Sequence, residues 1–334
     1  MGPMIHMGPV GPTRLMTHQT HALGIEIGGS ALRMGVIDRE GSVGHSKRTS
    51  SSHLRDQSCA MTQLLCEVER FLTEADVQVT DLAGIGIAAA GLVDNERRAM
   101  VSASNLGWRD LEIGSPVEEH AGIRTVVDKD TNMAALGELM VGAGRGFDSF
   151  IYAAIGTGVG GSVIYGGQLV RGIGNRAGEF GHLIAGGEEI CGCGARGCLE
   201  TLAGGAWLAR RAGEAIADGS RSVIAELAGN SVDEITARTV VEAAKQGDGL
   251  AVSLLATAAD ALGAALINTI RMIYPEAVII GGTVGSVRRF VFEPVKAFVE
   301  SNSVLPGTNL PPVHVLPAGL GDSAAIIGAA LSVF

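Results

Sequence analysis

Apolar runs broken by glycine turns open the folded part of the chain. From residue 22 the sequence reads ALGIEIGGSALRMGVIDREG, and this alternation of β-rich runs and turns predicts an antiparallel meander. Leucine, valine and phenylalanine at helical spacing over 58–73 predict a helix, and the apolar run from residue 84 predicts a buried strand. The expected order is therefore three strands, a helix and a strand.

A similar pattern returns about one domain later. A short helix near 115–121 and a strand at 124–128 are expected before 131–144, where TNMAALGELMVGAG predicts a helix and its end. Residues 149–172, SFIYAAIGTGVGGSVIYGGQLVRG, again place a glycine turn between two strand-like runs. We interpret this return as a weak internal duplication of a strand, glycine turn, strand unit.

The remainder is predicted to be mainly helical, and the whole to form two packed domains. Helices are expected from Thr201, over 236–248, 250–273 and 288–301, and from Ser323, with strands at 277–280 and 313–316. We expect a disordered tail at 1–21, a small α/β domain formed by 22–131 plus 319–334, and a larger α/β domain at 132–318.

Composition and charge exclude several classes of function. The net charge of the 334 residues is -10 and no dense Lys/Arg block occurs, which argues against a nucleic-acid partner. Anionic ligands must then be bound by local groups. No apolar run approaches the roughly 20 residues that span a bilayer, and the first residues lack a signal-peptide core, so we expect no membrane partner and a cytoplasmic location.

A dense cysteine cluster indicates metal binding. His182, Cys191, Cys193 and Cys198 supply the imidazole and thiolates that tetrahedral zinc prefers, although buried free thiols are the alternative. Four protein ligands would close the site, so the zinc would be structural and would fix the loop between Glu179 and Glu200. Carboxylates held rigidly suit sugar hydroxyls, although either glutamate alone is as compatible with a solvated surface. Cys59 and Cys66 are expected to be inert.

Three glycine turns follow apolar strands, at 27–30, 155–161 and 280–285. Glycines let backbone N–H groups approach phosphate oxygens, but no Lys-Ser/Thr pair follows as a P-loop requires, and the first two turns enter strands rather than helices. A single such turn is as compatible with a plain hairpin. Three turns in two repeated halves favour a nucleotide held between domains, as in the actin-like and hexokinase-like ATPase architecture.

From residue 22 onward the chain resembles the ROK family of sugar kinases and repressors, most closely its bacterial glucokinases. The resemblance is carried by AGEFGHL at 177–183 and CGCGARGCLE at 191–200. It implies an α/β, two-domain actin-like/hexokinase-like (ribonuclease H-like) fold with a cleft between the domains. It also implies a homodimeric, ATP-dependent kinase that phosphorylates the 6-hydroxyl of glucose and uses Mg²⁺ and structural Zn²⁺.

The resemblance assigns roles to particular residues. In DKDTNMAALGE, at 128–138, it makes Asp130 the catalytic base, whereas the sequence without the resemblance favours a helix-capping role. The implied sugar contacts are Asn105, Asp130, Glu179, His182 and Glu200; the implied phosphate loops are Gly28, Gly29, Ser30 and Gly156, Thr157, Gly158; the implied adenosine turn is Gly281 and Gly282.

Four residues depart from the family pattern: Glu26 replaces an aspartate, Ser30 a threonine, Ala90 a frequent proline, and Lys129 an asparagine before the catalytic aspartate. Lys129 either lowers the pKa of Asp130 or points to solvent. It motivates a second hypothesis, a kinase for an aminosugar, an N-acetylhexosamine or a cyclitol. Glu26 motivates a third, a sugar-sensing repressor, which the roughly 20 residues before the first strand disfavour because a winged helix-turn-helix needs more.

Overall fold

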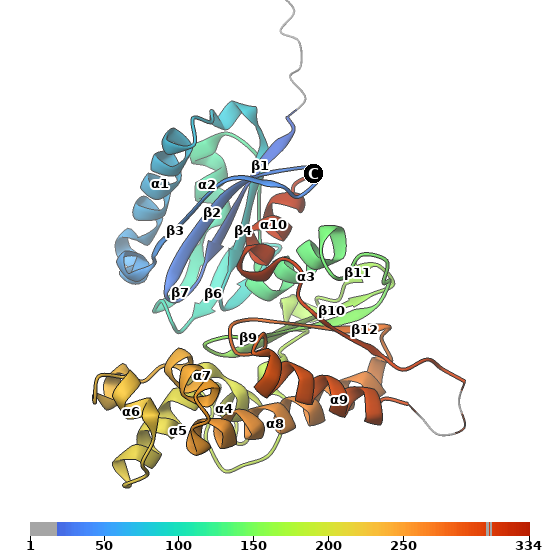
Figure 1. Cartoon of the computed structure of the whole chain (residues 1–334). Coiled ribbons are helices and arrows are strands. Elements are labelled where there is room, and N and C mark those ends of the chain that lie inside the picture. Colours follow the sequence, from blue (N-terminus) through green and yellow to red (C-terminus); the bar gives the residue numbers. More distant parts are fainter. Residues whose placement is uncertain (1–18, 305–306, 308) are drawn as a thin grey trace, which may run out of the picture.

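The structure is a computed structural model that describes residues 19–304, 307 and 309–334. Most of the expected disordered tail, residues 1–18, lies outside the described residues. His21 already belongs to the first strand. The two five-stranded sheets lie one above the other in Figure 1, with helices around each and α3 (Asp130–Val141) between them.

The upper sheet contains the expected meander. Strands β1, β2 and β3 are antiparallel neighbours, and β4 and β8 extend the sheet in parallel in the order β3-β2-β1-β4-β8. Figure 1 shows α1 and α2 beside one face and α10 on the other. The bounds are β1 His21–Ile27, β2 Ala31–Asp38, β3 Val43–Ser50, α1 Gln57–Glu74, β4 Leu82–Ala89, α2 Gly114–Ala121, β8 Thr125–Lys129 and α10 Ala324–Leu331.

A second, three-stranded sheet in this half was not predicted from the sequence. It consists of β5 (Leu92–Asp94), β6 (Ala99–Ala103) and β7 (Trp108–Glu112). Trp108 is buried, and its indole N–H donates to the carbonyl of Leu54 at 2.7 Å. This contact fixes the β6–β7 turn, which carries Asn105.

The lower sheet repeats the plan of the upper one. In both, a hairpin closes around a glycine turn and a parallel strand flanks its first strand: β4 beside β1, and β12 beside β9. The predicted duplication is therefore present in the topology. The lower order is β11-β10-β9-β12-β13, with bounds β9 Phe150–Ile155, β10 Val159–Tyr165, β11 Gln168–Leu169, β12 Ala277–Gly281 and β13 His314–Pro317.

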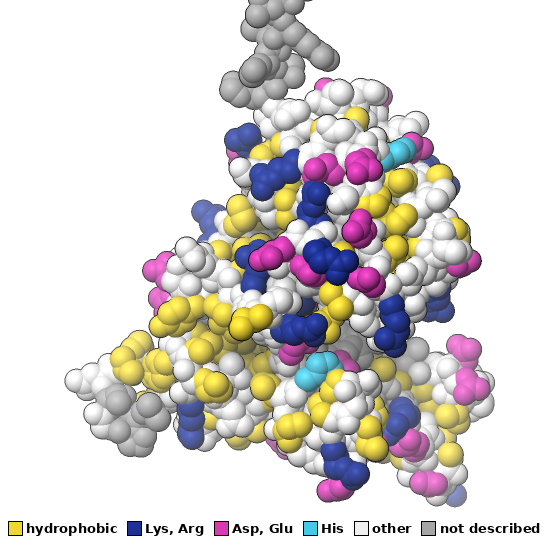
Figure 2. Space-filling view, turned by 180° about the vertical axis from the view of Figure 1, so that it is seen from behind, with side chains coloured by type: hydrophobic (Ala, Val, Ile, Leu, Met, Phe, Trp, Pro, Cys, Tyr) yellow, Lys and Arg dark blue, Asp and Glu magenta, His cyan; other side chains and the backbone are white. Residues whose placement is uncertain are grey.

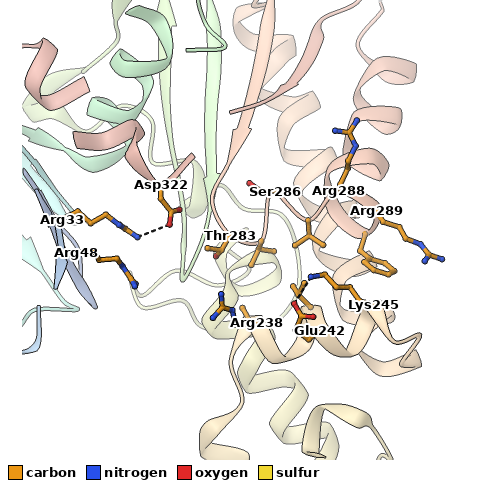
Figure 3. A pocket seen from close by; sticks show the side chains of 15 residues that line it. Arg33, Arg48, Arg238, Glu242, Lys245, Thr283, Ser286, Arg288, Arg289 and Asp322 are labelled. Carbon is orange, nitrogen blue, oxygen red and sulfur yellow. Dashed lines mark hydrogen bonds and ion pairs between the residues drawn. The ribbon is translucent and has the colours of Figure 1, made fainter. Parts of the chain in front are cut away.

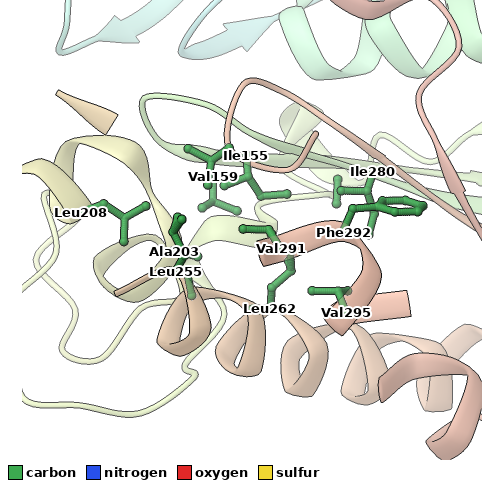
Figure 4. Packing of buried hydrophobic residues seen from close by; sticks show 14 of the residues in the cluster. Ile155, Val159, Ala203, Leu208, Leu255, Leu262, Ile280, Val291, Phe292 and Val295 are labelled. Atoms are coloured by element: carbon green, nitrogen blue, oxygen red, sulfur yellow. The ribbon is translucent and has the colours of Figure 1, made fainter. Parts of the chain in front are cut away.

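Helices cover the lower sheet, and their apolar faces form the largest core. They are α4 Glu200–Ala203, α5 Gly205–Ala217, α6 Val223–Leu227, α7 Ala237–Lys245, α8 Gly249–Ile273 and α9 Glu293–Asn302, the last preceded by a wide turn at 288–292. In Figure 4, Ile155 and Val159 of the sheet pack toward Leu255 and Leu262 of α8.

The length of α8 corrects one expectation. Its 25 residues are long and apolar enough to cross a membrane, although no such run was expected. Half of its most apolar window is buried inside the protein, and its buried side chains belong to the core under the lower sheet. The helix is apolar because it serves as a core helix.

Helix α3 (Asp130–Val141) lies between the two sheets and joins the halves. It approaches α10 closely because Gly137 and Gly328 face the backbone of the opposite helix. The fully buried Glu138 accepts backbone hydrogen bonds from Ala143, Gly319 and Leu320 at 2.7–3.0 Å. Ala143 follows α3, and the other two residues precede α10, so one carboxylate joins the two segments through which the chain passes between the halves. Because α3 packs on both sheets, the domain limits given above stay a prediction.

Candidate active site

Asp130 begins α3 directly after the last residue of β8. Lys129 occupies the N-cap position, and among the described residues Asp130 accepts a hydrogen bond only from the next backbone N–H, that of Thr131, at 2.7 Å. The alternative that Asp130 serves as the helix cap is therefore wrong.

The surroundings of Asp130 make it a much weaker acid than usual. Desolvation is the largest effect and, with the nearby Glu26 and Glu179 carboxylates, raises the pKa of Asp130 to about 7, against opposing effects of the Thr131 N–H and Lys129. The residue as a whole is half-buried, but its carboxyl lies in the desolvated part. A carboxylate that exchanges a proton near pH 7 is suited to act as a general base.

Glu26 faces this region from β1, where Arg33 pairs with it across the hairpin. Arg33 donates to Glu26 at 2.8 Å and lies 3.7 Å from Asp322. Burial raises the pKa of Glu26, although the adjacent Arg33 acts in the opposite direction. The glutamate that departs from the family pattern is thus paired with a cation of its own chain.

Lys129 does not point to solvent, which corrects that alternative. Its side chain is 5% exposed, and its ammonium group donates to the carbonyl of Ala177 at 2.7 Å and to Glu179 at 3.0 Å. The other alternative is confirmed in direction, because the positive charge lowers the pKa of Asp130 even though burial outweighs it. Lys129 thereby joins the start of α3 to a predicted sugar contact.

A buried polar network beside Lys129 was missed in the sequence. The Asp128 carboxylate accepts hydrogen bonds from Asn132, Asn175 and Arg171 at 2.7–2.9 Å, and Ser162 donates to Asn132 at 2.7 Å. The only local signal was the run of polar residues at a strand-to-helix junction, since the partners come from the segment after β11 and from β10. The network fastens that segment to the end of β8.

The predicted metal ligands lie together. The ligand atoms of His182, Cys191, Cys193 and Cys198 are all within 4.8 Å of one another. The His182 Nδ1 to Cys191 Sγ and the Cys193 to Cys198 Sγ–Sγ distances are both 3.6 Å. Tetrahedral zinc with bonds of about 2.3 Å to sulfur places its ligands about 3.7 Å apart, so this set fits the ion.

Glu200 links this cluster to the second glycine turn. Its carboxylate accepts the backbone N–H of Val159 at 3.0 Å, and its other oxygen lies 4.0 Å from the sulfur of Cys191. A Cβ on Gly158 would come within 2.3 Å of Glu200, so only glycine allows this approach. One face of the cysteine loop therefore meets the glycine turn.

The first glycine turn meets Asn105 in the same way. A Cβ on Gly29 would lie 2.6 Å from the Asn105 Cβ, and the turn is closed by a hydrogen bond from the Gly28 N–H to the carbonyl of Ala31 at 2.9 Å. Ser30 is exposed at the end of the turn. Asn105 is thus placed beside a predicted phosphate loop.

Two cavities of about 790 and 310 Å³ adjoin one another and share Ala237, Arg238 and Thr283. In Figure 3, Arg33 and Arg48 reach the larger cavity from the upper sheet, and the remaining labelled basic side chains come from the lower half. The basic residues that line it are Arg33, Arg48, Arg238, Lys245, Arg288 and Arg289, against the acidic Glu242 and Asp322. An acidic protein thus concentrates cations in this cleft.

The glycine turns differ in whether they line these cavities. Gly156 and Thr157 line the smaller cavity, whereas the described residues lining either cavity do not include Gly28, Gly29, Ser30 or Gly158. The turn after β12 packs on the second glycine turn, because Gly282 has φ of +82° and a Cβ there would approach the Ile155 carbonyl to 2.4 Å. Gly281 and Gly282 thereby place Thr283 at both cavities.

Charge is mixed on the face of the molecule opposite to the view of Figure 1. Figure 2 shows basic and acidic side chains interspersed on the face that it presents, together with scattered hydrophobic side chains.

Comparisons with known proteins match almost the whole chain to members of one family. The sequence profile of the ROK family matches residues 22–333. The glucokinase of Streptomyces coelicolor is 33% identical over 92% of this chain and 96% of its own. A ROK glucokinase from Streptomyces griseus, solved with glucose and AMPPNP, has a TM-score of 0.81 and 33% identity over 93% of this chain and 98% of its own. A ROK family transcriptional regulator also has a TM-score of 0.81, with 26% identity over 94% of this chain and 77% of its own.

Proposed function

This chain belongs to the ROK family, and we propose that it is an ATP-dependent glucokinase that phosphorylates the 6-hydroxyl of glucose with Asp130 as the general base. The observation that carries the assignment of the base is the desolvated Asp130 carboxyl, whose pKa is raised to about 7 mainly by burial. The similar glucokinases supply the reaction class. The two-domain hexokinase-like fold supplies the cleft in which it would occur.

Asp130 would act on the sugar hydroxyl. A primary alcohol is a weak nucleophile, so a positioned carboxylate that takes its proton as the γ-phosphoryl group moves lowers the barrier. The proton passes from the hydroxyl oxygen to an oxygen of Asp130, and the hydroxyl oxygen forms the new bond to phosphorus while the bond to ADP breaks. Asp130 then releases the proton to solvent.

The sugar would lie between the cysteine loop and the start of α3. Glu179, Glu200 and Asn105 offer acceptors and donors to its hydroxyls. The cysteine cluster would hold zinc, which would supply structural rigidity. With Nδ1 of His182 facing Cys191 at 3.6 Å, Nε2 of the same ring is left to donate to a sugar hydroxyl.

ATP would occupy the two cavities. Backbone N–H groups of Gly156 and Thr157, which line the smaller cavity, would bind its phosphates there, and phosphates that extend beyond the cavities would meet Gly158 and the turn 28–30. Arg238 and the other cations of the cleft would balance the phosphate charge, and Gly281 and Gly282 would form the adenosine turn. Mg²⁺, which binds phosphates together with one or two carboxylates, would balance the phosphate charge.

We also propose that the protein is a cytoplasmic homodimer. All five cysteines are free thiols, which suits a reducing compartment. Ile173, Ile184 and Ile190 are exposed by 97, 65 and 62%, and the last two lie on the cysteine loop. Burial of these side chains by a second copy would remove apolar surface from water.

A substrate panel tests the proposed reaction. ADP release should require sugar and Mg²⁺ together, and glucose should exceed mannose, N-acetylglucosamine and N-acetylmannosamine by at least about tenfold in kcat/KM. A preference for an N-acetylated sugar would instead support the aminosugar kinase hypothesis motivated by Lys129. Release of ADP without dependence on any of these sugars would contradict both.

The rate should depend on pH through Asp130. Because the base must be ionised and the pKa of Asp130 is about 7, kcat/KM is expected to fall about tenfold per pH unit well below that value. It should be nearly constant between about pH 8 and 9. A coupled assay from pH 5.5 to 9 measures this limb. A rate that stays constant down to pH 5.5 would show that no group with this pKa acts as the base.

A further inference from the structure

Lys129 is almost completely buried beside the proposed base, and none of the bond changes described above involves it. Its ammonium group contacts the carbonyl of Ala177 and the carboxylate of Glu179, at 2.7 and 3.0 Å. The lysine side chain is 5% exposed and that of Glu179 is 40% exposed. A buried ammonium group has lost its hydration and therefore needs the two oxygens of Ala177 and Glu179 as partners. Glu179 is partly exposed, so water can solvate it without the lysine. The contact is therefore a stronger requirement for Lys129 than for Glu179.

The contact joins the two halves of the fold at the sugar site. Lys129 is the last residue of β8 in the upper sheet, whereas Ala177 and Glu179 belong to the segment that follows β11 in the lower half. The preceding residue, Asp128, holds the same segment through Asn175 at 2.7 Å and Arg171 at 2.9 Å. Two consecutive residues at the end of β8 therefore fix this segment relative to the start of α3.

The pairing also limits what Glu179 can offer to a ligand. A lysine ammonium group only donates hydrogen bonds, and an ionised carboxylate only accepts them. One oxygen, Oε1, is engaged by Lys129, so the other remains for a group that donates. A sugar hydroxyl meets that requirement, while a hydrogen or fluorine atom at the same position does not.

We infer that Lys129 is a positioning residue of the sugar pocket: it fixes the free oxygen of Glu179 relative to Asp130, and the pocket therefore selects a sugar with a donating hydroxyl there. The inference rests on the proposed function, in which Glu179 and Asp130 both contact the sugar. Lys129 acts through Glu179 and takes no part in proton or phosphoryl transfer.

The charges around Asp130 give this role a second readout. Glu26 and Glu179 both raise the pKa of Asp130, while Lys129 lowers it; Arg33 faces Glu26. Removing the lysine charge leaves the two carboxylates without that opposing cation. The pKa of Asp130 should then rise further, and the acidic limb of the rate profile should move to higher pH.

The test is Lys129→Met, which keeps the length of the side chain and removes its charge. Calorimetry without ATP is expected to show a Kd for glucose at least about tenfold higher, with a similar rise in KM. At the pH optimum kcat should change by less than about threefold, because the lost contact is made equally in the ground and transition states. Lys129→Arg, which keeps a cation, should recover part of the affinity and restore the position of the acidic limb.

A double-mutant cycle separates positioning from general damage. In a Glu179→Gln background, Lys129→Met should raise the Kd for glucose by less than half as much on a logarithmic scale as it does in the wild type, because its partner is already altered. Lys47→Met removes a lysine that pairs with Glu74 at 2.6 Å at the end of α1, and should leave both Kd and rate unchanged. Equal effects of Lys129→Met in the two backgrounds, or an unchanged Kd with an unmoved pH limb, would overturn the inference.

The same measurements distinguish this inference from the proposed function. A wild-type protein that binds glucose without phosphorylating it would refute the kinase assignment, and the Kd series would still decide the role of Lys129. A wild-type protein that binds none of the four sugars of the panel would refute both. Circular dichroism and thermal unfolding of each variant identify any that fails to fold, in which case Lys129→Arg provides the comparison.

Discussion

Replacement of Asp130 by asparagine is expected to lower kcat by about 10³- to 10⁴-fold while the Kd for glucose changes by less than about tenfold. Asparagine keeps the shape of the side chain and the acceptor for the Thr131 N–H, which lies 2.7 Å from the carboxylate. It cannot take a proton from the sugar hydroxyl. Asp130→Ala, which also removes the acceptor, should lose turnover to the same extent, and near-normal turnover in either variant would remove Asp130 from the mechanism.

The same substitution, Asp130→Asn, should lower the rate but raise the stability of the fold. The pKa of Asp130 is about 7 in the folded chain against an ordinary value of 3.8, so protonation of the carboxyl stabilises the folded state. This contribution to the free energy of unfolding is present at low pH and is lost as the pH rises through 7. At pH 8 the Asp130→Asn variant should therefore have a higher Tm than the wild type. Asp260→Asn, on the exposed side of α8, should change neither Tm nor kcat. A lower Tm for Asp130→Asn would contradict the burial of an ionised base.

Loss of one cysteine from the cluster is expected to remove the metal and the sugar site together. Cys198→Ala should reduce zinc from about one ion per chain to less than about 0.1, lower Tm by about 10 °C or more, and weaken glucose binding at least about 100-fold. The loop between Glu179 and Glu200 would lose the metal ion that holds its ligands together. Metal analysis, thermal unfolding and calorimetry measure the three effects.

Other cysteines provide the controls for this experiment. Cys66→Ala changes an exposed thiol on α1 and should keep both zinc and glucose affinity. Cys193→Ser changes an exposed ligand, so it should fold even if the buried Cys198 variant does not. Wild-type protein purified with zinc present that contains none, yet binds glucose fully, would contradict a structural role for the metal.

Features that depend on neighbouring residues were predictable from the sequence. The hairpin around Gly156 follows from two apolar runs and a glycine turn, and it forms β9 and β10. The clustering of His182 with the three cysteines follows from ligand types packed into one short segment, and their atoms lie within 4.8 Å of one another. In both cases the chain needs only local turns to bring the groups together.

Features that depend on distant partners were not predictable. Lys129 was compatible with solvent because its partner Glu179 is 50 residues away, and only the packing of the two halves shows the pair. The sheet of β5, β6 and β7 is held by antiparallel pairing and by the burial of Trp108, and its short strands carry no strong alternation. Asn175 reaches Asn132 across 43 residues, which no local spacing reveals.

A crystal structure of the wild-type protein with bound glucose, recorded at the zinc absorption edge, tests the central claim most directly. The claim is that a fixed cysteine loop places Glu179 and Glu200 around a sugar whose 6-hydroxyl faces Asp130. The expected result is an anomalous peak among His182, Cys191, Cys193 and Cys198, with the 6-hydroxyl within about 3.2 Å of the Asp130 carboxylate. Glucose bound with its 6-hydroxyl away from Asp130, or no zinc peak, would contradict the account.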